Sequence, residues 1–148
     1  MTASRCPTLV LCWGNPSRGD DALGPMMAEW LETRQSLKFD VLCDFQLQIE
    51  YAADLLDRES IIFVDAALNL EKAFSVQTLS AQSDNSISSH ALSPQALLQV
   101  FQQVYRQPSP HAQLLSIQGY EFALGQSVSA QAENNLQQAK AWLTEQLL

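Results

Sequence analysis

Three acidic residues and one histidine are the side chains of this sequence best suited to chemistry at a shared site. Asp20 and Asp21 follow the first apolar run, Asp65 ends a later one, and His90 ends a polar segment of small residues. Two carboxylates and an imidazole, without a thiolate, suit nickel, zinc or manganese and leave coordination positions open for a metal-assisted reaction. The alternative is structural, because an Asp at the end of a strand is more often a cap or turn residue.

Strands and helices alternate along the chain, as the spacing of its apolar residues indicates. Short apolar runs predict strands at 8–13, 39–45, 61–64, 74–79 and 114–117. Apolar residues at helical spacing predict helices at 21–35 and 49–56, from the Ser93-Pro94 cap to Pro108, and at 130–148. This order predicts one α/β domain, residues 1–148, with a mostly parallel sheet covered on both faces.

The candidate residues should meet at one edge of that sheet. In open α/β sheets the ligand crevice lies beyond the carboxyl ends of the strands, where Asp21, Asp65 and His90 are expected. The other polar side chains expected at this edge are Asn15, Asp20, Asp44, Gln46 and Glu50. His111 precedes its strand and should therefore lie at the opposite edge.

The composition favours a globular domain that does not bind nucleic acid. Apolar residues make up 47% of the 148 residues, and the formal net charge of −8 would repel a polyanion. No window approaches the ~20 apolar residues of a membrane span, and residues 1–7 lack the pattern of an export signal. Cys6, Cys12 and Cys43 have no CxxC spacing and are expected to be reduced core thiols in the cytoplasm.

Several other functional classes lack their sequence signals. Residues 14–19 have the spacing of a phosphate-binding loop, but Asp20 and Asp21 stand where its Lys and Ser/Thr would be, which disfavours a nucleotide-binding module. The sequence has neither a GxSxG elbow nor the Asp-Thr/Ser-Gly signature of pepsin-like proteases. Any catalysis should therefore rest on carboxylates and His90, with or without a metal.

Five segments of the chain resemble, in order, the motifs of hydrogenase maturation proteases. The first is GNPSRGDDALGP at residues 14–25, directly after an apolar strand. The others are DFQLQIE at 44–50, IFVDA at 62–66, SSHALSP at 88–94, and GYEF at 119–122 with Gly125 and Ser129. The segment at 44–50 resembles the branch that serves NAD-linked bidirectional hydrogenases.

This resemblance implies a twisted five-stranded sheet between helices, of phosphorylase/hydrolase-like type, with a metal site of Asp21, Asp65 and His90. It implies a cytoplasmic endopeptidase that removes the C-terminal extension of a nickel-loaded large-subunit precursor of a nickel-iron hydrogenase. The nickel would come with the precursor and would place the scissile carbonyl and its attacking water. Asp20 is expected to have a supporting acid/base or orienting role, and the free protein is expected to be a monomer.

The sequence departs from the family pattern at three places. Ala22 stands where many members have Gly, Phe45-Gln46-Leu47 replaces Gly-Gly-Thr, and Asp21 stands where some relatives have Glu. We interpret these differences as those of a branch. Two other functions remain open: a non-catalytic assembly factor that binds the same nickel site, and a general metallohydrolase with the same fold.

Overall fold

The computed structural model describes residues 5–34, 38–82 and 92–147, in which strands and helices alternate except for two strands that follow one another. The strands are β1 (Thr8–Trp13), β2 (Phe39–Asp44), β3 (Ser60–Ala67), β4 (Phe74–Leu79) and β5 (His111–Gln118). The α-helices are α1 (Leu23–Glu32), α2 (Pro94–Tyr105) and α3 (Ala130–Leu147), and the 3-10 helices are η1 (Gly19–Ala22) and η2 (Ile49–Leu55).

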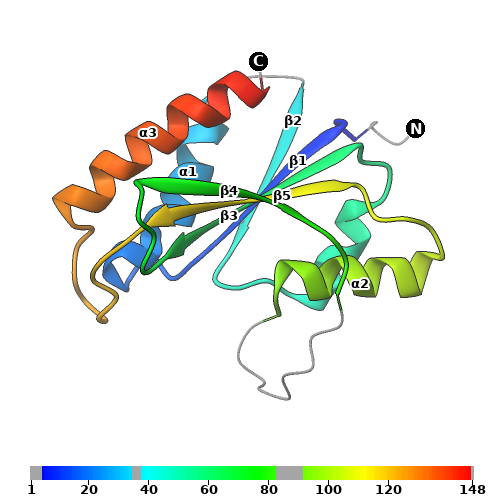
Figure 1. Ribbon diagram of the computed structural model, residues 1–148, viewed down its shortest axis with the longest axis horizontal. Coiled ribbons are helices and arrows are strands. Elements are labelled where there is room, and N and C mark those ends of the chain that lie inside the picture. The colour runs from blue at the N-terminus through cyan, green and yellow to red at the C-terminus, as the bar shows by residue number, and fades with distance from the viewer. Residues whose placement is uncertain (1–4, 35–37, 83–91, 148) are drawn as a thin grey trace.

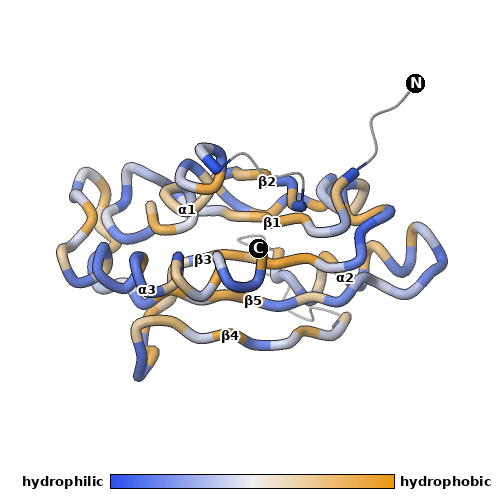
Figure 2. The backbone as a smooth tube through the Cα atoms, turned by 90° about the horizontal axis from the view of Figure 1, so that it is seen from above, coloured by the Kyte–Doolittle hydropathy of each residue, from blue (hydrophilic) through white to orange (hydrophobic). Residues whose placement is uncertain are grey.

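The five strands form one sheet in the order β2-β1-β3-β5-β4 (Figures 1 and 2). The first four strands of this order are parallel, and β4 runs antiparallel to β5 at the edge of the sheet. The sheet is therefore mixed but mostly parallel, which confirms the fold predicted from the sequence.

Helices cover both faces of the sheet, as the ribbon shows (Figure 1). Successive side chains of a strand point to opposite faces, so each central strand contributes to two cores. Val10 and Cys12 of β1 belong to the core beneath α1 and α3. Leu9 and Leu11 belong to the core beneath η2 and α2. The continuous apolar runs of the buried strands thus contribute side chains to the cores on both faces of the sheet.

The segment after β1 differs from the predicted helix at 21–35. It forms the 3-10 turn Gly19–Ala22 first, and α1 begins only at Leu23. The reason is tertiary: the backbone N–H groups of Gly19 and Asp20 donate to the carbonyls of Gln126 and Glu121. A distant loop, which sequence spacing does not reveal, thus anchors the 3-10 turn, and the α-helix begins at Leu23 and not at Asp21.

The third strand is longer than the predicted 61–64. It continues to Ala67 because β3 pairs with β5 along its whole length, from Ser60 opposite His111 to Ala67 opposite Gln118. Asp65 therefore lies within β3 and not at its end. His111 opens β5 at the amino edge of the parallel strands, which confirms its expected position away from the candidate site.

The structure confirms some of the remaining local predictions and contradicts one. The Ser93 side chain accepts a hydrogen bond from the Ala96 N–H, which confirms the predicted cap of α2. Cys12 is buried as expected, whereas Cys43 is exposed on the edge strand β2, so the prediction of a core thiol is wrong there. No helix within the described ranges is both long and apolar enough to cross a membrane.

Candidate active site at the carboxyl ends of the parallel strands

The structure brings Asp21 and Asp65 together beside the carboxyl end of β1. Asp21 lies in η1, directly after β1, and Asp65 lies in β3 one position beyond the residue pair Cys12–Val64. The two carboxylates interact electrostatically, and the Trp13 side chain donates a hydrogen bond to Asp65. Adjacent parallel strands thus bring two acids from distant parts of the sequence near one another, although Asp65 lies within β3 and not at its end.

The environment of Asp65 shifts its proton affinity towards neutrality. Burial of the carboxyl and the nearby charge of Asp21 raise its pKa to about 7, and hydrogen bonds from Ala66 and Trp13 only partly oppose this. A carboxyl with a pKa near 7 can both hold and release a proton at physiological pH, which suits acid/base chemistry. The same proton can be displaced by a cation that binds between the two acids.

The loop between β1 and η1 holds Asp21 by its own backbone. The Asn15 N–H donates to Asp21 Oδ2 at 2.7 Å, while the Asn15 side chain accepts a hydrogen bond from the Ser17 N–H at 2.8 Å. A Cβ at Gly14 would lie 2.0 Å from the Asp21 carbonyl oxygen, so only glycine fits there. The close turn therefore requires the Gly-Asn start of the motif and fixes the position of the carboxylate.

Asp20 points away from this pair and is completely buried. Its carboxylate accepts four hydrogen bonds, from the backbone N–H groups of Tyr120, Glu121 and Ser129 and from the Ser129 hydroxyl. Burial raises the pKa of Asp20, but these hydrogen bonds outweigh it, and the pKa lies below its ordinary value. Of the two supporting roles expected for Asp20, this geometry favours orientation over proton transfer.

The polar residues after β2 take part less directly. Asp44 accepts hydrogen bonds from the Phe45 N–H at 2.6 Å and from the Tyr51 hydroxyl at 2.8 Å. Burial, followed by this bond to Asp44, raises the pKa of Tyr51 to about 12. Asp44 thus stabilises the turn into η2, while Gln46 and Glu50 are exposed side chains.

The described part of the chain supplies two of the three predicted metal ligands. His90 lies outside the described residues, and within those residues no group of three His, Cys, Asp or Glu side chains could hold a metal ion. The donor chemistry of Asp21 and Asp65 fits a divalent cation, because bound positive charge relieves the repulsion between two nearby carboxylates. The three-ligand site itself stays a prediction.

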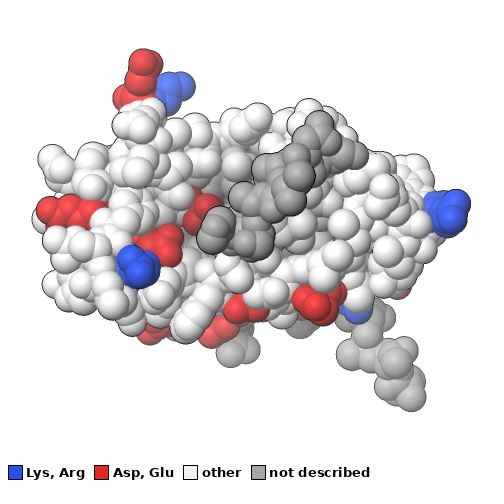
Figure 3. Space-filling view, turned by 90° about the horizontal axis from the view of Figure 1, so that it is seen from below, with Lys and Arg blue, Asp and Glu red and all other residues white. Residues whose placement is uncertain are grey.

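One face of the molecule carries more acidic than basic side chains on one of its halves. Several acidic side chains gather on one half of the face shown in Figure 3, and basic side chains are few among them. A field of one sign concentrates ions and chain segments of the opposite charge. A face of this charge favours a cation or a basic segment over an anionic ligand.

Sequence reasoning did not find two contacts that shape the site. The first is the hydrogen bond from Trp13 to Asp65, and the second is the attachment of Asp20 to the loop that follows β5. A signal for the second existed in the block at 119–122 with Ser129, which resembles a family motif. The structure supplies the physical reason for that block, since its N–H groups bind the Asp20 carboxylate.

The fold is the α/β fold of hydrogenase maturation proteases, which the chain matches along almost its entire length. The chain resembles HycI from Thermococcus kodakarensis KOD1, a nickel-iron hydrogenase maturation protease, with a TM-score of 0.75 and 17% identity over 98% of this chain and 94% of that one. It resembles the hydrogenase maturating endopeptidase HybD from E. coli with a TM-score of 0.76 and 20% identity, over 97% and 92% of the two chains.

A third match is the hydrogenase 2 maturation peptidase from Thaumarchaeota archaeon SCGC_AB-539-E09. The TM-score is 0.68 and the identity 20%, over 97% of this chain and 98% of that one. No family model and no curated protein matches the sequence. At identities this low the likeness establishes a shared fold, and function has to be argued from the site.

Proposed function

We propose that this chain is an endopeptidase that removes the C-terminal extension of a nickel-loaded large-subunit precursor of a nickel-iron hydrogenase. One observation carries the proposal: the paired carboxylates of Asp21 and Asp65 lie at the carboxyl edge of a sheet with the fold of hydrogenase maturation proteases. Ligands of open α/β sheets bind at this edge, and the pair is partly buried and suited to a cation there.

In this proposal the nickel belongs to the substrate and serves as a recognition mark. Asp21, Asp65 and His90 contact it, and the contact places the scissile carbonyl and the attacking water close to one another. Asp65 also takes part in proton transfer in this proposal, as acceptor from that water or donor to the leaving amine. Asp20 keeps η1, and with it Asp21, in place through its bonds to the loop after β5.

We further propose that the protein acts in the cytoplasm as a monomer and that its partner is the large-subunit precursor. The net charge of −8 argues against nucleic acid as an additional partner. The segment at 44–50 suggests a substrate from the NAD-linked bidirectional group, because it resembles the motif of that branch.

The decisive experiment mixes the purified protein with nickel-loaded and nickel-free precursor and follows the precursor by mass. We expect a loss of mass at the C-terminus with the nickel-loaded precursor alone. Binding without cleavage would instead support a non-catalytic assembly factor. Turnover of small esters or peptides would support a general metallohydrolase, and cleavage of the nickel-free precursor would show that nickel recognition is wrong.

Three substitutions test the assigned residues: Asp21→Asn, Asp65→Asn and His90→Ala. Each removes a charge or a nitrogen ligand, and we expect cleavage to fall by about 100-fold or more because substrate placement is lost. Glu145→Gln is the matched control, since it removes an exposed carboxylate on α3 that has no part in the site. Normal cleavage by the three variants would show that the site lies elsewhere.

A further inference from the structure

The two edge strands of the sheet differ in how they are protected against pairing with another chain. The edge strand β2 contains Asp40 and Asp44, and Asp40 forms an ion pair with Arg58. The opposite edge strand β4 has the sequence FSVQTL, with neither a charged residue nor a proline. Charges and prolines are the usual means by which natural proteins block strand addition. The β4 edge lacks both.

The hydrogen-bonding groups on the outer edge of β4 can be assigned from its register. The Gln118 N–H donates to the Ala73 carbonyl, and the pairing continues from Phe74 opposite Ile117. Antiparallel pairs alternate between bonded and non-bonded positions, so Ser75 and Gln77 bond to β5. The N–H and C=O groups of Phe74, Val76 and Thr78 therefore point away from the sheet, and no other described strand pairs with them.

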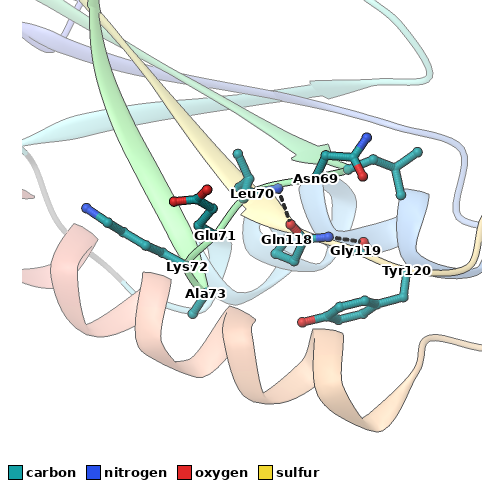
Figure 4. Close-up of a pocket in the computed structure, with 9 residues that line it drawn as sticks. Asn69, Leu70, Glu71, Lys72, Ala73, Gln118, Gly119 and Tyr120 are labelled. Carbon is teal, nitrogen blue, oxygen red and sulfur yellow. Dashed lines mark hydrogen bonds between the residues drawn. The ribbon is translucent and has the colours of Figure 1, made fainter.

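Two adjoining cavities run beside this edge. The first, of about 530 Å³, lies between the β3–β4 loop and the residues that follow β5 (Figure 4). The second, of about 420 Å³, continues along β4 to Val76 and Gln138. Lys72 and Ala73 line both cavities, which makes them one groove. The groove thus starts beside the carboxyl ends of β3 and β5 and continues along the edge strand β4.

The β4 strand is held firmly enough to act as a template. The Phe74 ring packs on Trp142 of α3 with a centroid distance of 6.3 Å, and Val76 packs against the core beneath α3. At the mouth of the groove, Gln118 accepts a hydrogen bond from the Leu70 N–H and donates one to the Gly119 carbonyl (Figure 4). A preorganised strand loses little conformational entropy when it pairs with a peptide.

We propose that the outer edge of β4 binds an extended segment of the substrate precursor as an added antiparallel or parallel strand. This inference rests on the proposed function and goes beyond it, since it assigns a second contact surface for the precursor outside the nickel site. Main-chain hydrogen bonds from Phe74, Val76 and Thr78 would supply the affinity, as in other cases of strand addition.

The distance between the two surfaces limits which part of the precursor can reach β4. Asp65, Ser116 and Ser75 lie side by side on three adjacent strands. An added strand would therefore lie about three strand spacings from β3, roughly 14 Å, which an extended chain spans in about four residues. The bound segment should begin at least about four residues from the cleaved bond.

A second copy of this chain is the competing occupant of the edge. Each copy carries a net charge of −8, so pairing two copies brings like charges together and is disfavoured by electrostatic repulsion. The groove begins at the residues that follow β3, the strand that carries Asp65. The repulsion between copies and this nearness to the candidate site both favour the precursor.

The first test removes an outward N–H group without breaking the β4–β5 pairing. Val76→Pro does this, and Val76→Ala is its matched control because it loses the side chain but keeps the N–H. We expect Val76→Pro to raise the KM for nickel-loaded precursor about tenfold with kcat within about twofold, because a contact made equally in the ground and transition states has been lost. Val76→Ala should keep KM within about twofold.

The second test measures amide hydrogen exchange and does not depend on how well Val76→Pro folds. In the free protein the amides of Phe74, Val76 and Thr78 should exchange faster than those of Ser75 and Gln77. Adding nickel-free precursor to the wild type, which is expected to leave it uncut, should slow all three outward amides.

The possible outcomes separate this inference from the proposed function. Normal cleavage by wild type and by Val76→Pro, with unchanged exchange on β4, would overturn the docking surface and leave the function standing. No cleavage of nickel-loaded precursor by the wild type would overturn the function and remove the occupant proposed here. Slow exchange that develops with protein concentration alone would assign the edge to a second copy.

Discussion

Asp20 and Asp65 are acidic residues beside the same edge of the sheet, yet their surroundings have opposite effects on the charged form. The Asp20 carboxylate accepts four hydrogen bonds, and its pKa lies below the ordinary value. Asp65 is partly buried next to the charge of Asp21, and its pKa rises to about 7. The first environment stabilises a fixed anion, whereas the second disfavours one.

This contrast separates a carboxylate that stabilises the fold from one that can do chemistry. A carboxylate that already accepts four hydrogen bonds has little accepting capacity left and contributes by holding elements together. A carboxylate with unrelieved repulsion costs stability in the free protein, and the binding of a cation can recover that energy. Asp20 and Asp21 are adjacent in sequence, yet Asp20 is held by the loop after β5, whereas Asp21 lies near Asp65.

The largest expected effect on stability is that of Asp20→Ala. The substitution leaves the N–H groups of Tyr120, Glu121 and Ser129 without their acceptor in a buried place. We expect the free energy of unfolding to fall by about 3–5 kcal/mol. Urea denaturation followed by circular dichroism measures this change. A loss below about 1 kcal/mol would show that Asp20 is not a structural anion and would reopen a role in proton transfer.

The second prediction concerns Asp65→Asn, which should stabilise the free protein at neutral pH. The pKa of Asp65 in the folded protein, about 7, lies above its ordinary value of 3.8. The contribution of this group to wild-type stability is therefore fully present below about pH 4 and is lost as the pH rises through 7. Asn cannot ionise, so above pH 7 the variant should exceed wild type by about 2–4 kcal/mol. Cleavage should nevertheless be lost.

Paired denaturation curves at pH 4 and pH 8, in chelator, test this sign. The difference in free energy of unfolding between variant and wild type should widen as the pH rises. Taking this difference cancels the contributions of the other titrating groups. A variant that is less stable than wild type at pH 8 would show that Asp65 is structural, like Asp20.

Asp21→Asn should have an intermediate effect, which acts through the pKa of Asp65. Removing the Asp21 charge eliminates one cause of the raised pKa of Asp65, so that pKa should fall while remaining above 3.8 because burial is unchanged. A carbon-13 NMR titration of the Asp65 carboxyl would show the shift. An unchanged titration would mean that the two acids lie too far apart to share a cation.

Much of the fold could be predicted from the sequence because its signals are local. The apolar run at 8–13 became β1 with the same limits, and Ser93-Pro94 capped α2 as its residue types indicated. The failures come from long-range contacts. Pairing with β5 extended β3 beyond Asp65, and the bonds of Gly19 and Asp20 to the loop at 121–126 anchored a 3-10 turn that moved the start of α1 to Leu23. No periodicity in the sequence encodes either contact.

The sequence nominates the members of the candidate site, but it does not reveal the surroundings of each side chain. The position of Asp21 and Asp65 at one sheet edge follows from strand order, which alternating elements imply. The different states of Asp20 and Asp21 depend on which way each side chain points after a turn. That direction is set by Gly14 and by a loop a hundred residues further along the chain, as the Tyr120 N–H bond to Asp20 shows. Residue types alone could not assign it.

The smallest expected effect is that of Ser129→Ala, and it tests how the two environments are connected. The substitution removes the hydroxyl that donates to Asp20 Oδ2 and accepts from the Ala132 N–H at the start of α3, but it keeps the Ser129 N–H bond to Asp20. We expect a loss of about 1–2 kcal/mol of stability in urea denaturation.

Precursor cleavage by Ser129→Ala should fall only about two- to threefold, because three of the four bonds to Asp20 remain and Asp21 is still held by the Asn15 N–H. Ser129→Thr is the control, since it retains a hydroxyl at the same position. A loss of cleavage as deep as that of Asp65→Asn, with stability reduced by no more than the expected amount, would show that Asp20 takes part in the reaction. Asp20 would then not be a purely structural carboxylate, and its contrast with Asp65 would no longer hold.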